Sequence, residues 1–173
     1  MRFVRVIMRS VFKALEFVPF AGKTFRVTNM YGRISRLERL GKRDEARRLR
    51  HQAIEVTAKA RSALLWRSEG EDLFYYKKDY VGALEAYENA IEALNGSAAL
   101  YGVSNPCAIY GDASQAAVMA GEREAALKYY GTFAQWVEYL DKGVKSGPDL
   151  EWHHELLARL RKELGEPPPT EPL

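Results

Sequence analysis

Three stretches of the chain share one pattern, in which a small or polar turn is followed by an alanine near the start of a helical segment. The stretches are LGKRDEA at 40–46, KDYVGAL at 78–84 and AGEREAAL at 120–127. Each is typical of the corner between two paired helices. The alanines Ala46, Ala83 and Ala126 lie 37 and 43 residues apart, a spacing typical of stacked helical hairpins. This pattern predicts an all-α fold, an α-solenoid of about three stacked helix-turn-helix hairpins.

Apolar residues at helical spacing divide the rest of the chain into helices and breaks. Helices are predicted at 24–40, 42–60, 62–77, 80–94, 107–120, 122–142 and 149–164, and no segment has the pattern of a strand. Pro19 and Gly22 predict the end of an earlier helix. We therefore expect three regions, namely a basic amphipathic helix at 1–22, a helical repeat domain at 23–165 and a proline-rich tail at 166–173. The helix at 149–164 is expected to cap the array, with its leucines turned inward.

Residues around the second corner resemble the tetratricopeptide repeat. In that family the first helix carries a Trp, a Gly and a large residue, and the second carries an Ala, an aromatic residue and an Ala. The matching residues here are Trp66, Gly70 and Leu73 in the first helix, and Ala83, Tyr87 and Ala90 in the second. The two halves are out of step by one residue, so we expect a turn at 77–79 that is one residue longer than the family's.

The other two corners are similar to the same repeat at fewer positions. The third unit has Tyr110, Ser114 and Ala117, then Ala126 and Tyr130, with Phe133 where a small residue is expected. The first unit has Met30, Ile34 and Leu37, then Ala46 and Ala53, with Arg50 in the place of the aromatic residue. The resemblance therefore covers residues 27–141.

The resemblance implies a concave groove lined by those side chains of the first helices that are not used in packing. The lining residues would be Ser68, Glu69, Asp72, Tyr75, Tyr76, Asp112, Gln115 and Met119. Such a groove would be acidic with an aromatic floor, and it would suit a basic or amphipathic peptide. The alternative is that Glu69 and Asp72 only solvate a surface while Tyr75 packs.

Residues 2–17 combine a narrow cationic stripe with a broad apolar surface. Arg2, Arg5, Arg9 and Lys13 recur at spacings of three, four and four residues, and most of the residues between them are apolar. A cation in every turn argues against a spanning helix and against a secretory signal. The stripe suits anionic lipid headgroups, with the helix lying in the interface. The alternatives are a part of the core, a homodimer contact or an organelle presequence.

Basic and acidic residues are divided unequally along the chain. Residues 1–61 contain 16 Lys+Arg and 5 Asp+Glu, net +11, which leaves 10 and 18 for the remainder, net −8. The two parts could neutralise each other, or the basic part could meet an anionic partner. A nucleic-acid patch would use Arg33, Arg36, Arg39, Lys42, Arg43, Arg47, Arg48 and Arg50. The lack of interleaved exposed aromatic residues and of a reading helix argues against nucleic acid.

No catalytic residue, cofactor site or metal site is expected. Cys107 has no second cysteine with which to form a disulfide, and we expect a buried, unreactive thiol. His153 and His154 would point about 100° apart on a helix, which does not suit a compact metal site. The sequence contains no phosphate-binding loop and no nucleophile motif.

Together these patterns predict a non-enzymatic adaptor or scaffold that binds a protein or peptide of unknown identity through the groove. A peripheral membrane protein anchored by the N-terminal helix is one alternative, and a secretion chaperone or an immunity-type protein is another. The lone cysteine fits a cytoplasmic protein, whose first helix could contact the inner face of a membrane.

Overall fold

A computed structural model describes residues 19–57, 59–94, 106–143 and 148–165 of the 173-residue chain. The described elements are α2 (Pro19–Arg39), α3 (Arg43–Val56), α4 (Lys59–Asp72), the π-helical turn η1 (Leu73–Lys77), α5 (Tyr80–Leu94), α6 (Pro106–Ala120), α7 (Arg123–Gly143) and α8 (Pro148–Leu164). No strand occurs in these ranges. The prediction of an all-α array of helical hairpins is confirmed, and the chain divides into two units, 1–58 and 59–173.

The first unit contains the hairpin of α2 and α3. Its facing sides bury Ile34 from α2 and Ala46 and Ala53 from α3, as expected from their helical spacing. Arg50 is only 1% exposed, and its guanidinium donates a hydrogen bond to the carboxylate of Glu38 over 2.8 Å. The prediction that Arg50 belongs to a basic surface is therefore wrong, because this side chain is buried in an ion pair.

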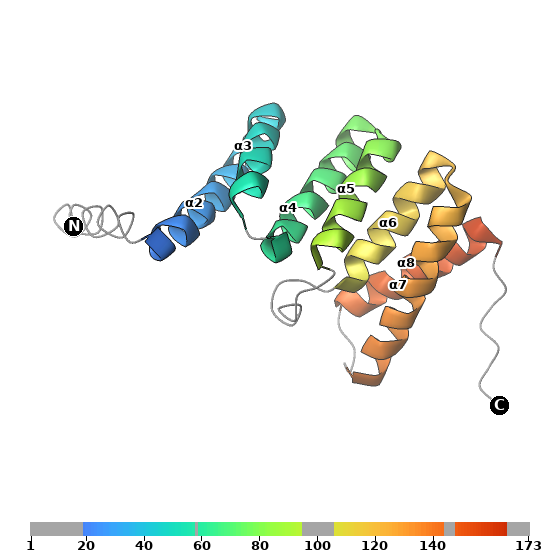
Figure 1. Cartoon of the computed structure of the whole chain (residues 1–173). Helices are drawn as coiled ribbons and strands as arrows, with labels where there is room; N and C mark the ends of the chain where they lie inside the picture. The colour runs from blue at the N-terminus through green and yellow to red at the C-terminus, as the bar shows by residue number, and fades with distance from the viewer. Residues whose placement is uncertain (1–18, 58, 95–105, 144–147, 166–173) are drawn as a thin grey trace. The chain divides into compact units, whose positions relative to one another are not determined.

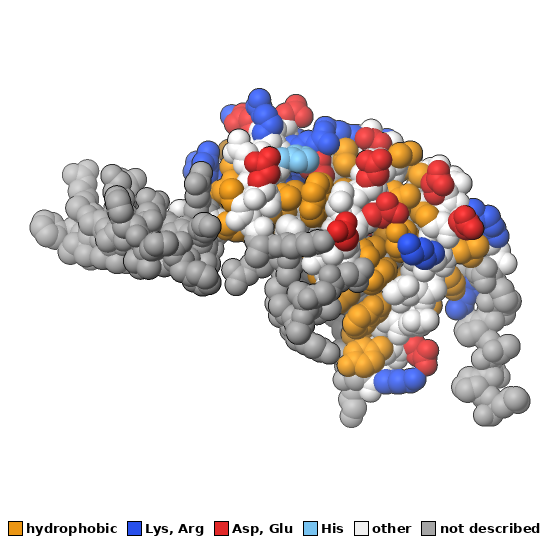
Figure 2. Space-filling view, viewed as in Figure 1, with side chains coloured by type: hydrophobic (Ala, Val, Ile, Leu, Met, Phe, Trp, Pro, Cys, Tyr) orange, Lys and Arg blue, Asp and Glu red, His pale blue; other side chains and the backbone are white. Residues whose placement is uncertain are grey.

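The second unit is built from two hairpins and a further helix. Helices α4 and α5 form the first hairpin and α6 and α7 the second, and α5 packs against α6 (Figure 1). Helix α8 packs against both α6 and α7. Its leucines Leu156, Leu160 and Leu164 are buried in the core, as the sequence pattern predicted. Acidic side chains, few cations and some hydrophobic side chains are scattered over the side of this unit that Figure 2 shows.

The three predicted corners share one hydrogen bond at the start of their second helix. The amides of Ala46, Ala83 and Ala126 each donate to the carbonyl four residues earlier, over 2.9 to 3.0 Å. All three alanines are fully buried. A larger side chain at these positions would push the paired helices apart, which explains why the repeated alanines mark the corners.

The second corner differs from the other two in the way its first helix ends. At Gly41 and Gly121 the backbone is left-handed, with φ of 72° and 80°, and the closing bonds run from Lys42 to Leu37 and from Glu122 to Ala117. At the second corner Asp79 instead reaches back to the carbonyl of Leu73, one residue further. The chain makes room for this extra residue with the π-helical turn η1. The sequence predicted a longer turn at 77–79, whereas the structure accommodates the extra residue in the helical turn before it.

One expected helix boundary is wrong. The sequence predicted a helix end between Pro19 and Gly22, but α2 begins at Pro19 and continues through Gly22. Proline is well accommodated at the first helical position, where its missing N–H would have no intrahelical partner. The cationic stripe of Arg2, Arg5, Arg9 and Lys13 and the tail at 166–173 lie outside the described residues.

Candidate functional site

The packing of the α4–α5 hairpin fixes one side of the candidate site. Gly70 on α4 lies against the ring of Tyr87 on α5, and a Cβ atom at Gly70 would lie 2.5 Å from the nearest ring carbon. Tyr87 is 1% exposed. The absence of a side chain at Gly70 therefore lets the two helices approach around a buried aromatic ring, and this sets where the outward side chains of α4 lie.

An ion pair joins the two hairpins. Nε of Arg67 on α4 donates a hydrogen bond to Oδ2 of Asp112 on α6 over 2.9 Å. The same guanidinium lies 3.4 Å from the carboxylate of Glu71, one helical turn along α4. Asp112 is 5% exposed, so its negative charge depends on Arg67 for compensation. This contact holds α4 and α6 in one register.

Burial and neighbouring charges shift the pKa values in this cluster. Burial raises the pKa of Asp112 to about 6, although Arg67 acts in the opposite direction, and Glu71 raises it further. Burial alone would lower the pKa of Arg67, but the nearby Asp112 and Glu71 together raise it. Arg67 therefore stays charged, and Asp112 changes its charge near pH 6.

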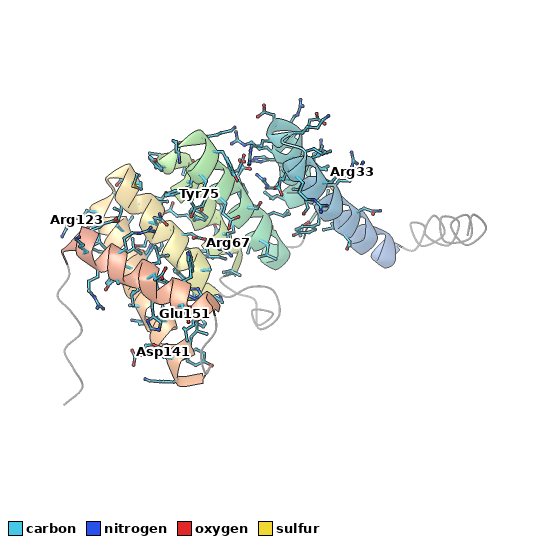
Figure 3. The ribbon with its side chains drawn as sticks, turned by 180° about the vertical axis from the view of Figure 1, so that it is seen from behind. Arg33, Arg67, Tyr75, Arg123, Asp141 and Glu151 are labelled. Atoms are coloured by element: carbon cyan, nitrogen blue, oxygen red, sulfur yellow. The ribbon has the colours of Figure 1, made fainter. Side chains whose placement is uncertain are left out.

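Tyr75 extends this cluster to the surface and toward α8. Tyr75 is 48% exposed. Burial of the other half raises the pKa of its hydroxyl, and so do Asp112 and Glu71, whereas Arg159 on α8 and Arg67 lower it. The phenol therefore lies within electrostatic range of charges on three helices. Figure 3, drawn from the side on which α8 lies in front, labels Arg67 and Tyr75.

The register set by Arg67 and Asp112 places two further side chains of α6 along the same surface. Gln115 and Met119 follow Asp112 by three and seven residues, which puts them on one side of the helix. Gln115 is half-buried, and Met119 is 49% exposed. We call this surface the α4–α6–α8 face, defined by Arg67, Glu71, Tyr75, Asp112, Gln115, Met119 and Arg159.

The structure brings together only part of the predicted groove. Tyr75, Gln115 and Met119 are at least partly accessible on the α4–α6–α8 face, whereas Asp112 is 5% exposed and does not line an open groove as predicted. Ser68 is half-buried beside Arg67 on α4, and Tyr76 is 60% exposed in the π-helical turn.

Two further predicted groove residues are buried. Glu69 and Asp72, three residues apart on one side of α4, are 1% and 5% exposed. Both alternatives from the sequence, a groove lining and a solvated surface, would have left these carboxylates accessible.

Three residues of the face were not predicted from the sequence. Arg67 and Glu71 lie on the same helix as the predicted residues, and their i, i+4 spacing with opposite charges was the available signal. Arg159 was expected only as an outward residue of a capping helix. It is indeed exposed, but its position near Tyr75 depends on how α8 packs against α6 and α7.

The cysteine and the two neighbouring histidines of α8, the other residues that could be reactive, are buried or hydrogen-bonded within the fold. Cys107 is fully buried in the first turn of α6, and burial raises the pKa of its thiol to about 12. His153 is buried beside the ring of Phe133, while Nε2 of His154 lies 2.9 Å from the carboxylate of Asp141. Among the residues described by the structure, no group of His, Cys, Asp and Glu could hold a metal ion.

Within residues 19–57, 59–94, 106–143 and 148–165, no helix has both the length and the apolar character needed to cross a membrane.

Comparison with known proteins adds no family to these observations. No protein-family model matches the chain. A search of curated proteins also finds no match.

Proposed function

We propose that this protein is a non-enzymatic adaptor that binds a partner protein or peptide on the α4–α6–α8 face. The observation that carries the proposal is that two exposed apolar side chains, Tyr75 and Met119, lie on the same face as a fixed polar cluster. They are 48% and 49% exposed. The ion pair of Arg67 and Asp112 ties together the helices that carry them, so that little ordering would be needed on binding.

The charges of the face narrow the kind of partner. Asp112 is buried and compensated by Arg67, so it offers little charge to a ligand. Glu71 and Arg159 remain accessible, and their charges are opposite. An amphipathic segment with an apolar anchor and charges of both signs fits this surface better than a purely basic peptide.

We also interpret the two hairpins of the second unit as diverged tetratricopeptide repeats. The contact between Gly70 and Tyr87 supports this interpretation, as do the buried alanines Ala83 and Ala126 at matching corners. The extra residue in η1 and the large Phe133 in place of a small residue are departures from the family's pattern.

The proposal is tested with peptides selected for binding from a displayed library of random sequences. The double variant Tyr75→Ala with Met119→Ala should weaken binding of the selected peptides to the purified full chain about 30-fold or more, as expected when central anchors are lost. Isothermal titration measures the effect. Both side chains are about half exposed, so we expect the variant to keep its fold, which circular dichroism checks.

A matched control changes two exposed apolar side chains outside the face. Val81 on α5 is 57% exposed and Tyr139 on α7 is 65% exposed. The double variant Val81→Ala with Tyr139→Ala should bind the same peptides as the unchanged chain does. If the selected peptides no longer bind this control variant but still bind the variant with Tyr75→Ala and Met119→Ala, the proposed face is the wrong one.

A further inference from the structure

The outer side of α2 is cationic without compensation. Of the described α2 side chains from Val27 onward, those exposed to solvent belong to Thr28, Asn29, Gly32, Arg33, Ser35, Arg36 and Arg39. Three of these residues are arginines and none carries a carboxylate. Arg33 projects away from the hairpin of α2 and α3 (Figure 3). We call Arg33, Arg36 and Arg39 the α2 arginines.

The carboxylates nearest in sequence to the α2 arginines are engaged elsewhere or belong to α3. Glu38 is half-buried and accepts a hydrogen bond from the buried Arg50 over 2.8 Å. Glu45 lies 3.0 Å from Lys42, at the corner that opens α3. Among the described residues, no carboxylate forms an ion pair with the α2 arginines. Their positive potential is therefore available to an external anion.

The spacing of the α2 arginines makes them an extended surface. They recur every three residues, so that Arg36 and Arg39 lie opposite the side of α2 on which Met30 and Ile34 are buried, and Arg33 lies on its flank. Each step of three residues advances about 4.5 Å along a helix. Such a row contacts several anionic groups at once more readily than it encloses one small ligand.

We propose that the α2 arginines dock the protein on an anionic lipid surface. The sequence of the preceding residues 2–17 favours a membrane over a nucleic acid as the partner. They carry cations at helical spacing among apolar residues such as Phe3, Ile7 and Phe12, which suit a lipid interface and have no counterpart on a phosphate backbone. This proposal is independent of the adaptor function.

The test compares vesicles of phosphatidylcholine with vesicles that also contain phosphatidylglycerol. The full chain should bind only the anionic vesicles, and added salt should weaken the binding. In the full chain, the triple variant Arg33→Gln, Arg36→Gln and Arg39→Gln should lower the lipid partition coefficient roughly 100-fold, since each cation near an anionic bilayer contributes about fivefold. Lipid titration followed by flotation measures the coefficient.

A second triple variant removes the same number of charges from the second unit. Lys128, Lys142 and Lys162 are exposed on α7 and α8. Their change to glutamine should leave the partition coefficient close to that of the unchanged chain. Equal losses in the two triple variants would overturn the proposal, because only net charge would then matter. Unchanged binding of the α2 variant would overturn it as well.

Nucleic acid is tested with the same variants and a short DNA duplex. If the α2 variant loses duplex binding while vesicle binding stays unchanged, the surface serves nucleic acid and the lipid proposal is wrong. Circular dichroism on heating checks that both variants stay folded, as expected from the exposure of all six side chains.

Discussion

The α4–α5 and α6–α7 hairpins have the same helix-turn-helix arrangement, but different side chains pack between their helices. Gly70 and Ser114 occupy matching places in the first helices, and Tyr87 and Tyr130 match in the second. In the first hairpin the Tyr87 ring lies directly against Gly70. In the second, the Ser114 hydroxyl donates a hydrogen bond to the Ala126 carbonyl over 3.0 Å. The same helix pair can therefore be closed by an aromatic ring on a glycine or by a buried hydrogen bond.

The aromatic residue of the second hairpin has a different role. The hydroxyl of Tyr130 accepts a hydrogen bond from Nε of Arg161 on α8 over 3.0 Å. Phe133 stands where the first hairpin has the small Ala90, and it is fully buried. Gly111 on the facing helix provides the space, since a Cβ atom there would lie 3.1 Å from the Phe133 ring. In both hairpins the small residue therefore lies on the first helix and the large one on the second, but at different positions along the helices, and the second hairpin also carries α8.

The largest expected effect is on the free energy of unfolding, and it should differ between Tyr87 and Tyr130. Tyr87→Ala should lower the free energy of unfolding by about 3–5 kcal/mol, because it empties a buried aromatic site between α4 and α5. Tyr130→Ala should cost less, because Tyr130 is 9% exposed and Tyr87 only 1%. Urea unfolding of both variants measures the difference. Equal losses would contradict the view that the aromatic residue closes only the first hairpin.

The comparison also shows what could be predicted from the sequence. Helical spacing and the corner alanines gave nearly every helix and the order in which they pack. Glu69 and Asp72 were misjudged because the sequence shows that a residue is polar, and not whether its side of the helix is covered by other chain segments. Arg159 was missed as a site residue because its distance from Tyr75 depends on the packing of α8. Burial and long-range register were thus the unpredictable part.

The next largest effect is a pH dependence of stability that arises from Asp112, whose ion pair with Arg67 joins the hairpins. Asp112 on α6 matches the uncharged Ser68 on α4, and burial raises the pKa of Asp112 to about 6. An unfolded aspartate titrates near pH 4, so the folded state holds this proton more tightly. The contribution of Asp112 to stability is therefore fully present below about pH 4 and is lost as the pH rises through about 6.

The variant Asp112→Asn tests this dependence. Its free energy of unfolding should lack the decline that Asp112 causes between about pH 4 and pH 6, which we expect to be on the order of 2 kcal/mol. Urea unfolding at a series of pH values gives the difference between the two proteins, in which the contributions of other titrating groups cancel. Parallel pH profiles would show that the Asp112 carboxyl titrates alike in the folded and unfolded states.

A smaller effect is expected from adding one methyl group to each hairpin. Gly70→Ala should destabilise the protein by about 1–2 kcal/mol, since the new Cβ atom would press on the buried ring of Tyr87. Among the described residues, a Cβ atom added at Gly131 on α7 would meet nothing within 4 Å except its chain neighbours and the backbone of its own helix. Gly131→Ala should therefore stabilise the helix by up to about 1 kcal/mol. Thermal unfolding should move in opposite directions for the two variants, and a shift in the same direction would contradict the close contact at Gly70.

The smallest expected effect comes from the Ser114 hydrogen bond, which stands in the second hairpin where the first has the contact between Gly70 and Tyr87. Ser114→Ala removes the buried donor to the Ala126 carbonyl, which should cost about 1 kcal/mol. Thr132→Ala is the matched control, because its hydroxyl makes a longer bond of 3.4 Å to the Lys128 carbonyl on the exposed side of α7. Both substitutions gain helix propensity, so the difference between their free energies of unfolding reports the buried bond alone. If the two variants are equally stable, packing by itself closes the second hairpin, and the contrast with Gly70 and Tyr87 is one of shape only.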